Sequence, residues 1–303
     1  MCRVLEVSTS GYYAWRVRNP SVHTVRDVAL TERVRAIHTR SRGTYGVPRI
    51  HAELADDGVH VGRKRVGRLM RKAGPQGVTR RKRALTTVRR SEDRPAPDLV
   101  QREFSASGPN QLWVADITYI RLKRECGYLA VLLDAYSRKV VGWALDRTLA
   151  ARLPIAALTH ALAERHLPPG LVHHSDRGVQ YASETYVTLL RTHHIIPSMS
   201  RPANPYDNAS CESFMKTLKR EEIYANTYRD LDHLRANIAA FIERYYNRDR
   251  LHSALGYHSP EEFEQAASSA PPATGATMRF FRPRAHAHAA SSARDQAEAT
   301  EGV

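Results

Sequence analysis

The spacing of hydrophobic residues changes near residue 110 of this 303-residue chain. Before that point, apolar residues recur at intervals of three and four, which is the period of an amphipathic helix. They predict three short helices, at about residues 30–41, 48–58 and 63–73. After it, short runs rich in β-branched and aromatic residues are bounded by turns, a pattern that favours strands. Two regions of different architecture therefore follow one another along the chain.

The third predicted helix has an apolar stripe formed by Val66, Leu69, Met70 and Ala73. Basic residues cover its other sides, namely Arg63, Lys64, Arg65, Arg68, Arg71 and Lys72. Three short helices of which the last is basic fit a small all-α, helix-turn-helix-like domain whose final helix enters the major groove of DNA. A basic arm follows, made of Arg80, Arg81, Lys82 and Arg83. We place this DNA-binding domain at residues 26–84, after an irregular segment 1–25.

The second region alternates predicted strands and helices. The strands are expected at 112–120, 128–134, 139–145, 171–174 and 195–199, and the helices at 153–166, 184–192, about 208–224 and 231–246. Three adjacent strands followed by alternating elements predict an α/β fold, a mixed sheet flanked by helices, within residues 106–265. Residues 85–105 lack sustained periodicity and are interpreted as a linker. Residues 266–303, rich in Ala, Ser, Pro and His, are interpreted as a disordered tail.

The positive charge of the chain lies almost entirely in its first third. The net charge is +15, and residues 1–100 carry 22 Lys and Arg against 9 Asp and Glu. Basic side chains that neutralise phosphates release counterions, so a polyanion such as double-stranded DNA is the expected partner. A solvated basic face is the ordinary alternative.

Several classes of protein are excluded or disfavoured. No apolar run approaches the length of about 18 residues that a membrane span needs. The first residues lack the layout of a signal peptide, so we expect a cytoplasmic protein. Three scattered cysteines, Cys2, Cys126 and Cys211, argue against a disulfide framework or a cysteine-rich zinc site.

Three acidic residues are the candidates for chemistry. Asp116 lies within the apolar run 112–120, where burying an unpaired carboxylate is costly. Asp176 follows the short strand 171–174, and active sites of open sheets tend to lie at such strand exits. Glu212 lies near the start of a predicted helix. Taken singly, each acid has a structural explanation: a buried ion pair for Asp116, a turn for Asp176 and a favourable helix N-terminus for Glu212.

The helix that carries Glu212 separates its faces. Its core-facing residues are expected to be Cys211, Phe214, Met215 and Leu218. Glu212, Lys216 and Lys219 form the neighbouring stripe, on which the two lysines are suited to DNA phosphates. Three carboxylates suit phosphodiester chemistry, because two Mg²⁺ ions about 3.5–4 Å apart stabilise the attacking and the leaving oxygen together. Mg²⁺ prefers oxygen ligands, so His173 and His174 are expected to pack or to contact DNA or the Asp, and Asp134 to form a turn.

Three sequence motifs resemble those of insertion-sequence transposases of the retroviral-integrase type. They are WVADITY at 113–119, HSDRGVQY at 174–181 and NPYDNASCESF at 204–214. The last Asp and the Glu are separated by 35 residues, the spacing of that family. Residues 1–265 are similar to the OrfB-type product of two-frame elements, and the tail departs from the pattern.

The resemblance implies a ribonuclease-H-like catalytic core in which Asp116, Asp176 and Glu212 are catalytic and bind metal. It implies two Mg²⁺ ions, with Mn²⁺ as a substitute, and cleavage followed by strand transfer without a covalent protein–DNA intermediate. Lys219 is expected to contact the element's end. A homo-oligomer on DNA, a bacterial nucleoid-associated location and an upstream-frame product (OrfA) as partner or fusion are also implied.

Two alternatives remain at this point. One is a ribonuclease-H-like nuclease that cuts DNA without joining it. The other is a DNA-binding regulator or an inactive transposase remnant. Strand-transfer products would distinguish the first, and metal-dependent cleavage the second.

Overall fold

The computed structural model describes residues 2, 4–78, 96–100, 106–123, 125–200 and 209–269. The predicted basic arm at Arg80 to Arg83, most of the predicted linker, and residues 270–303 lie outside the described residues. The chain forms two compact units. One combines Met1–Arg90 with Lys216–Phe263 and is called the helical unit. The other combines Ser91–Met215 with Glu264–Val303 and is called the sheet unit.

The sheet unit is built on a five-stranded mixed sheet of order β3-β2-β1-β4-β5. Its strands are β1 Leu112–Arg121, β2 Cys126–Asp134, β3 Val140–Asp146, β4 Val172–Ser175 and β5 Ile196–Met199. The first three strands pair antiparallel, whereas β4 runs parallel to β1 and β5 parallel to β4. Each strand begins and ends within two residues of its prediction. This mixed sheet flanked by helices is the ribonuclease-H-like architecture expected from the sequence.

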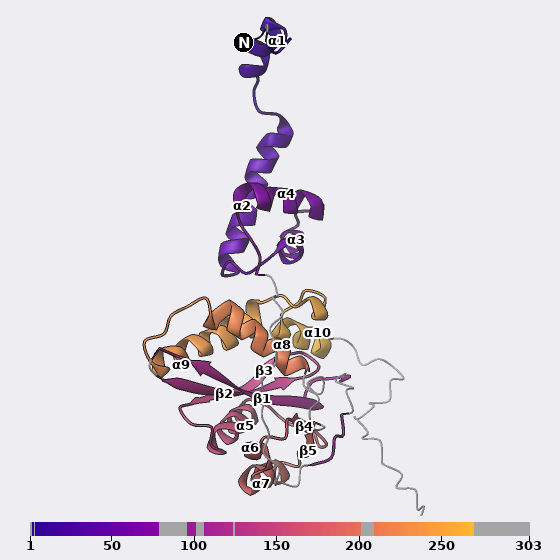
Figure 1. Ribbon diagram of the computed structural model, residues 1–303. Helices are drawn as coiled ribbons and strands as arrows, with labels where there is room; N and C mark the ends of the chain where they lie inside the picture. Colours follow the sequence, from indigo (N-terminus) through magenta and orange to yellow (C-terminus); the bar gives the residue numbers. More distant parts are fainter. Residues whose placement is uncertain are drawn as a thin grey trace, which may run out of the picture. The chain divides into compact units, whose positions relative to one another are not determined.

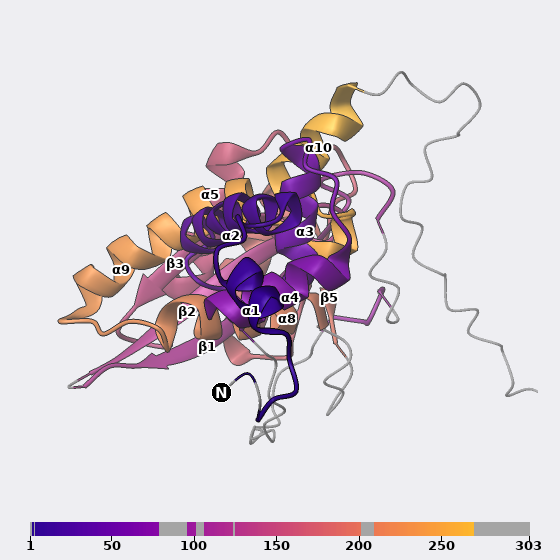
Figure 2. The same cartoon turned by 90° about the horizontal axis from the view of Figure 1, so that it is seen from above.

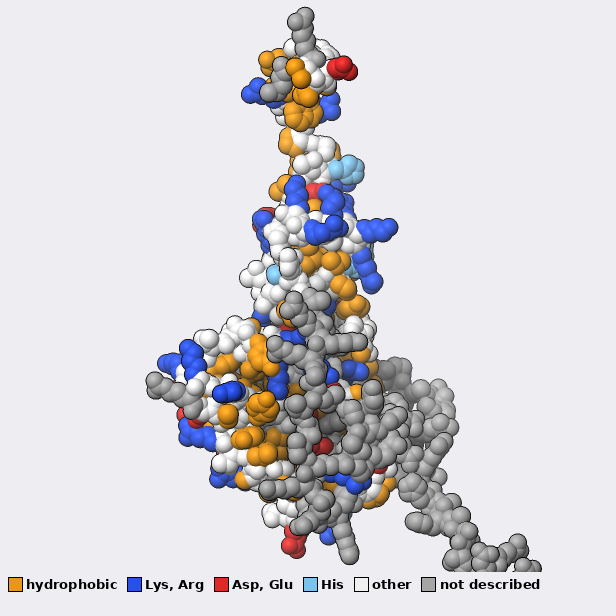
Figure 3. All heavy atoms as spheres, viewed as in Figure 1, with side chains coloured by type: hydrophobic (Ala, Val, Ile, Leu, Met, Phe, Trp, Pro, Cys, Tyr) orange, Lys and Arg blue, Asp and Glu red, His pale blue; other side chains and the backbone are white. Residues whose placement is uncertain are grey.

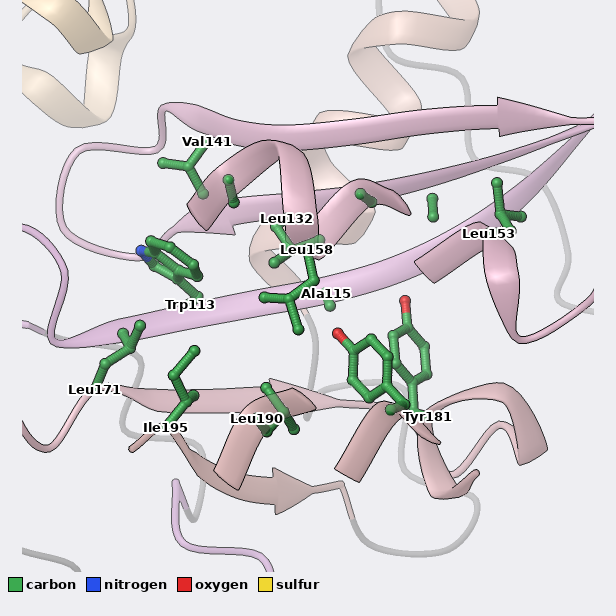
Figure 4. Close-up of a cluster of buried hydrophobic side chains, with 14 of the residues drawn as sticks. Trp113, Ala115, Leu132, Val141, Leu153, Leu158, Leu171, Tyr181, Leu190 and Ile195 are labelled. Carbon is green, nitrogen blue, oxygen red and sulfur yellow. The ribbon is translucent and has the colours of Figure 1, made fainter. Parts of the chain in front are cut away.

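Three helices cover one face of this sheet (Figure 1). They are α5 Arg152–Glu164, α6 Val179–Ala182 and α7 Glu184–Thr192. Figure 4 shows the core between them and the sheet, in which Trp113 and Ala115 of β1 pack with Leu158 of α5 and Leu190 of α7. Helix α5 approaches β3 so closely that a side chain on Gly142 would lie 2.3 Å from the Ala157 carbonyl oxygen. Only glycine therefore fits at this crossing.

Helix α8, Ala209–Leu218, begins over the opposite face of β1 (Figure 1) and continues as a π-helical turn, Lys219–Ile223. Its predicted core-facing residues, Cys211, Phe214, Met215 and Leu218, are all buried. Lys216 is exposed, while Glu212 and Lys219 are half-buried. The predicted separation of faces on this helix is confirmed. Residues 201–208, which precede this helix, lie outside the described residues.

The helical unit opens with α1 Thr9–Arg16, α2 Val22–Arg40, α3 Val47–Asp56 and α4 Arg63–Ala73. The helix predicted from residue 30 begins earlier, because the Ser21 side chain caps it at the Thr24 N–H. Helices α2, α3 and α4 lie side by side (Figure 2) around a core that includes Leu30, Val34, Val66 and Leu69. Helix α4 has the bounds, 63–73, that the apolar stripe of the third predicted helix indicated.

The C-terminal part of the helical unit contains α9 Leu231–Ala239, a π-helical segment Ala240–Asp249, a 3₁₀ turn Ser253–Leu255 and the start of α10 Pro260–Ser269. It packs on the N-terminal helices through side chains near the α2–α3 turn. The Tyr45 hydroxyl accepts from the Leu251 N–H at 2.8 Å, and Arg49 Nε donates to the Leu251 carbonyl at 2.9 Å. Arg42 forms an ion pair with the buried Glu222. Segments about 200 residues apart in sequence therefore share one folded unit.

Helix α10 extends to Ser269, so residues 266–269 are helical rather than part of a disordered tail. None of the helices in the described ranges is both long and apolar enough to cross a lipid bilayer.

Candidate active site

Asp116 and Asp176 are brought to neighbouring positions by the register of β1 and β4. These strands are parallel, and Val114 lies opposite His174. Each Asp is two residues further along its strand direction, so the same register leads the two carboxylates to the same edge of the sheet. Neighbouring strands are about 4.8 Å apart. A pair of residues that are 60 positions apart in sequence thus becomes a pair in space.

The electrostatics of two buried neighbours support this proximity. Burial raises the pKa of the Cys211 thiol well above its usual value, and the charges of Asp116 and Asp176 raise it further. Burial likewise raises the pKa of the Tyr181 phenol, with further contributions from Tyr186 and both aspartates. Both carboxylates therefore act on the same two side chains.

Glu212 is carried towards this pair by the first turn of α8. The Cys211 thiol donates to the Val114 carbonyl oxygen at 3.3 Å, which fastens this turn to β1 two residues before Asp116. The three predicted acids thus come from three elements that meet near one point of the sheet. Within the described residues, however, no three His, Cys, Asp or Glu side chains are close enough together to hold a metal ion.

The environment of Asp176 combines solvent access with partial desolvation. The residue is exposed, yet the surrounding protein raises the pKa of its carboxyl by desolvation. A hydrogen bond from the Gly178 N–H to Oδ1, at 3.0 Å, acts in the opposite direction. Among the described residues, no cationic side chain forms an ion pair with Asp176 at this strand end. A carboxylate that is only partly solvated in this way gains from binding a cation.

The hydroxyl of Tyr181 is a second feature of the region around Asp176. Its side chain is 2% exposed, and its hydroxyl has no hydrogen-bond partner within the described part of the chain. Its ring and Asp176 Oδ1 both lie within 4 Å of the position that a side chain on Gly178 would occupy. Buried polar atoms are rarely left unsatisfied, so this hydroxyl is available to a further hydrogen-bond partner.

His173 and His174 are part of the core and do not contribute to the candidate site's surface. His173 Nε2 bonds the Tyr186 hydroxyl at 2.9 Å, and His174 Nδ1 bonds the Ser198 hydroxyl at 2.9 Å. Burial, with a further contribution from His174, lowers the pKa of His173 to about 3. Both rings are buried, so the alternative of a contact with DNA does not hold for either.

Asp134 has the structural role that its position at a strand end predicted. It is fully buried and accepts backbone N–H groups from Asn110, Tyr136 and Ser137. It therefore closes the turn between β2 and β3.

The basic residues predicted to contact DNA fall into two groups on α4. Arg63, Lys64, Arg71 and Lys72 are exposed. Arg65 and Arg68 instead form ion pairs with Asp27 of α2, a contact that sequence reasoning missed. Figure 3 shows Lys and Arg side chains gathered over this part of the helical unit. The only sequence signal for the contact was an isolated acid in a basic region.

Comparison with known families and proteins identifies both parts of the chain. Residues 25–83 match the model of an HTH-like domain, and residues 106–205 and 193–260 match models of an integrase core domain. The "Insertion element IS600 uncharacterized 31 kDa protein" of Shigella sonnei is 39% identical over 88% of this chain and 97% of its own length.

Two relatives with transposase names are equally similar. The transposase for insertion sequence element IS904 of Lactococcus lactis is 39% identical over 82% of this chain and 98% of its own length. Transposase InsF for insertion sequence IS3A of Escherichia coli is 39% identical over 87% of this chain and 92% of its own length.

An integrase core joined to a helix-turn-helix-like domain defines a DNA transposase, a class of polynucleotidyl transferase. Within that class, the chain belongs to the family of insertion-sequence transposases that includes those of IS904 and IS3.

Proposed function

We propose that the chain cleaves DNA at the ends of an insertion sequence and joins the freed 3′ ends to target DNA, using divalent metal held by Asp116, Asp176 and Glu212. The observation that carries the proposal is the parallel register of β1 and β4, which leads two carboxylates to one sheet edge. The link from Cys211 to Val114 supports it by directing Glu212 to the same region.

The residues present fit a pair of Mg²⁺ ions, with Mn²⁺ as a substitute. Carboxylate oxygens are the ligands that Mg²⁺ prefers, and a few are enough because this ion keeps several waters. The partly desolvated carboxylate of Asp176 and the unsatisfied hydroxyl of Tyr181 are both consistent with an ionic occupant. When bound, two such ions stabilise the attacking and the leaving oxygen of a phosphodiester. Glu212, near the start of α8, would complete the ligand set.

The side chains near the carboxylates argue against a covalent route. The Ser175 hydroxyl donates to the Asp176 carbonyl oxygen at 3.0 Å, and the Tyr181 hydroxyl is buried. Neither is placed to attack a phosphodiester of DNA. Asp116 and Asp176 instead orient the reacting groups, and water and then a DNA 3′-hydroxyl serve as the nucleophiles.

DNA recognition is assigned to the helical domain at residues 26–84 and catalysis to residues 106–265. Arg63, Lys64, Arg71 and Lys72 contact DNA phosphates from exposed positions on α4. Arg80, Arg81, Lys82 and Arg83 are assigned the same role from their charge in the sequence. Lys219, on the stripe of Glu212, contacts the element's end, and Lys216 of the same stripe contacts DNA phosphates. The working form is a homo-oligomer on DNA, with the upstream-frame product as fusion or partner, in the bacterial cytoplasm.

The test uses the full chain, alone and fused to the upstream product, with labelled duplexes carrying the repeats that flank the gene. Nicking and joining are measured with Mg²⁺, with Mn²⁺ and with EDTA. Glu212→Gln should abolish both metal-dependent reactions. The matched variant Glu184→Gln makes the same change in the exposed first turn of α7 and should leave both intact.

The outcomes separate the candidate functions. Nicking that survives in Glu212→Gln would show that the three-carboxylate site is wrong. Nicking without joining in every form would favour the ribonuclease-H-like nuclease. DNA binding without cleavage in any form would favour the regulator or inactive remnant.

A further inference from the structure

Asp27 holds two arginines of α4 at once. Arg65 Nε donates to its Oδ1 at 2.8 Å, and Arg68 Nη2 donates to its Oδ2 at 2.6 Å. A second nitrogen of Arg65, Nη2, lies 2.6 Å from Oδ1. Each carboxylate oxygen therefore serves one guanidinium, and Asp27 bridges residues on α2 and α4 that are about 40 positions apart.

The packing beneath this bridge fixes its geometry. Leu30 and Val34 of α2 pack with Val66 and Leu69 of α4 in one buried cluster. Val66 follows Arg65 and Leu69 follows Arg68, so the backbone positions of both arginines are set by the core. The side chain of Asp27 is 20% exposed, against 35% for Arg65 and 56% for Arg68. The two guanidinium groups thus remain accessible while their acidic partner is largely covered.

The charge on Asp27 is kept by its partners. Hydrogen bonds from Arg68 and then Arg65 hold the pKa of the Asp27 carboxyl below its usual value.

A hollow beside the bridge is lined by Asp27, Arg65 and Arg68 together with His23 and Lys64. An arginine has five N–H donors, and Asp27 engages two nitrogens of Arg65 and one of Arg68. Donors therefore remain for a further acceptor.

An acid in this place works against simple attraction to DNA. Binding to phosphates depends on net positive charge, and Asp27 removes one unit of it from the most basic part of the chain. A guanidinium held in advance, however, loses less conformational freedom when it binds and presents its donors in a fixed direction. Arginine reads guanine by two directed hydrogen bonds to the base edge, for which direction matters more than charge.

We propose that Asp27 is a positioning residue that orients Arg65 and Arg68 to read base edges at the element's end. This inference rests on the proposed role of α4 in DNA binding. It raises the preference for that sequence and lowers the affinity for DNA in general. A merely structural bridge between α2 and α4 has no such opposite effects.

The experiment measures binding of the full chain to two duplexes, one with the flanking terminal repeat and one with the same bases scrambled. For Asp27→Asn we expect binding to the scrambled duplex to tighten, because a negative charge is lost. Binding to the repeat should weaken by about tenfold, the scale set by one misdirected arginine–guanine contact. The ratio of the two affinities is the readout.

Asp56→Asn is the matched control, because it removes the same charge from an exposed position on α3 of the same domain. It should tighten both duplexes alike and leave the ratio unchanged. The double variant Arg65→Lys with Arg68→Lys keeps the charge but loses the forked donors. It should lower the ratio without changing binding to scrambled DNA, and it keeps the test decisive if Asp27→Asn fails to fold.

Equal tightening on both duplexes in Asp27→Asn, with an unchanged ratio in the double variant, would overturn the inference alone. An original chain that binds repeat and scrambled DNA equally would overturn both the inference and end recognition by this domain. Cleavage assays on Glu212→Gln are independent of either result.

Discussion

Acidic side chains in the helical unit hold arginines, whereas Asp176 in the sheet unit stands at a strand end with a backbone N–H as its hydrogen-bond donor. Asp27 pairs with Arg65 and Arg68, Glu221 pairs with Arg250, and Glu222 pairs with Arg42. These three acids are thus neutralised within the fold. Asp176 keeps a desolvation cost that an external cation can offset. The contrast separates acids that are paired with arginines within the fold from an acid that we propose binds metal.

The largest effect on stability is expected from breaking the buried pair of the helical unit. Arg250 and Glu221 form a two-point contact at 2.7 and 2.8 Å, with side chains 6% and 7% exposed. Arg250→Met leaves Glu221 as a buried, unpaired charge, which should lower the free energy of unfolding by about 3–5 kcal/mol. Urea denaturation followed by circular dichroism measures this change.

The control is the exposed pair Arg248–Glu261, in which Arg248 is 65% exposed. Arg248→Met should cost less than about 1 kcal/mol. Similar losses for the two variants would contradict the structural role given to Glu221.

Asp176→Asn should separate activity from stability in the sheet unit. We expect metal-dependent nicking to fall by at least about 100-fold, because losing a metal ligand should cost more than losing a group that only orients one. In EDTA the variant should melt at the same or a higher temperature. The pKa of Asp176 is raised in the fold, so its ionised form costs stability as pH rises through that pKa, and Asn removes the cost.

Asp146→Asn is the matched comparison within the same unit. Arg152 holds the pKa of Asp146 at about 2, so the ionised form contributes stability above the usual pKa of an Asp. This variant should lose stability at neutral pH and keep nicking activity. A stability loss in Asp176→Asn as large as that in Asp146→Asn would be evidence that Asp176 is a structural acid.

Gly142→Ala tests the close packing of the sheet unit. The added methyl carbon would lie 2.3 Å from the Ala157 carbonyl oxygen and 2.8 Å from the Ala161 Cβ. Backbone must move, so we expect a loss of about 1–3 kcal/mol. In the helical unit, Gly62 has nothing within 4 Å of the same position. Gly62→Ala should lower the free energy of unfolding by only about 0.5 kcal/mol. Thermal denaturation of the two variants measures the difference.

A pH dependence of stability is expected from the buried core of the sheet unit. The pKa of His173 is lowered to about 3, so the unfolded chain binds a proton that the folded chain does not at intermediate pH. This contribution to stability is present above the usual pKa of histidine, about 6.5, and is lost as pH falls towards the folded value.

The slope from one such group is at most about 1.4 kcal/mol per pH unit. Denaturation at a series of pH values measures it, and His173→Gln should flatten it. Tyr186→Phe removes a hydrogen-bond partner but keeps the imidazole, so it should reduce stability while retaining the slope. An unchanged slope in His173→Gln would assign the acid sensitivity to other groups.

The sequence by itself determined the elements whose residues interact with near neighbours. The apolar stripe of Val66, Leu69 and Met70 predicted the bounds of α4. Helix α7 likewise has its predicted bounds, Glu184–Thr192. The buried face of α8 followed in the same way from Cys211 and its repeats. Helical and strand periods are local properties, because each residue's burial depends on residues a few positions away. The three acids were selected by motif and spacing, not by geometry.

Only the tertiary structure decided which distant side chains meet. No periodicity links Asp27 to Arg65 and Arg68, Tyr45 to Leu251, or Cys211 to the Val114 carbonyl. These contacts depend on how helices and strands pack, and packing is fixed by the shape of the whole core. For that reason the sequence indicated α4 as a basic helix, whereas the fold decided which of its arginines an acid holds in place.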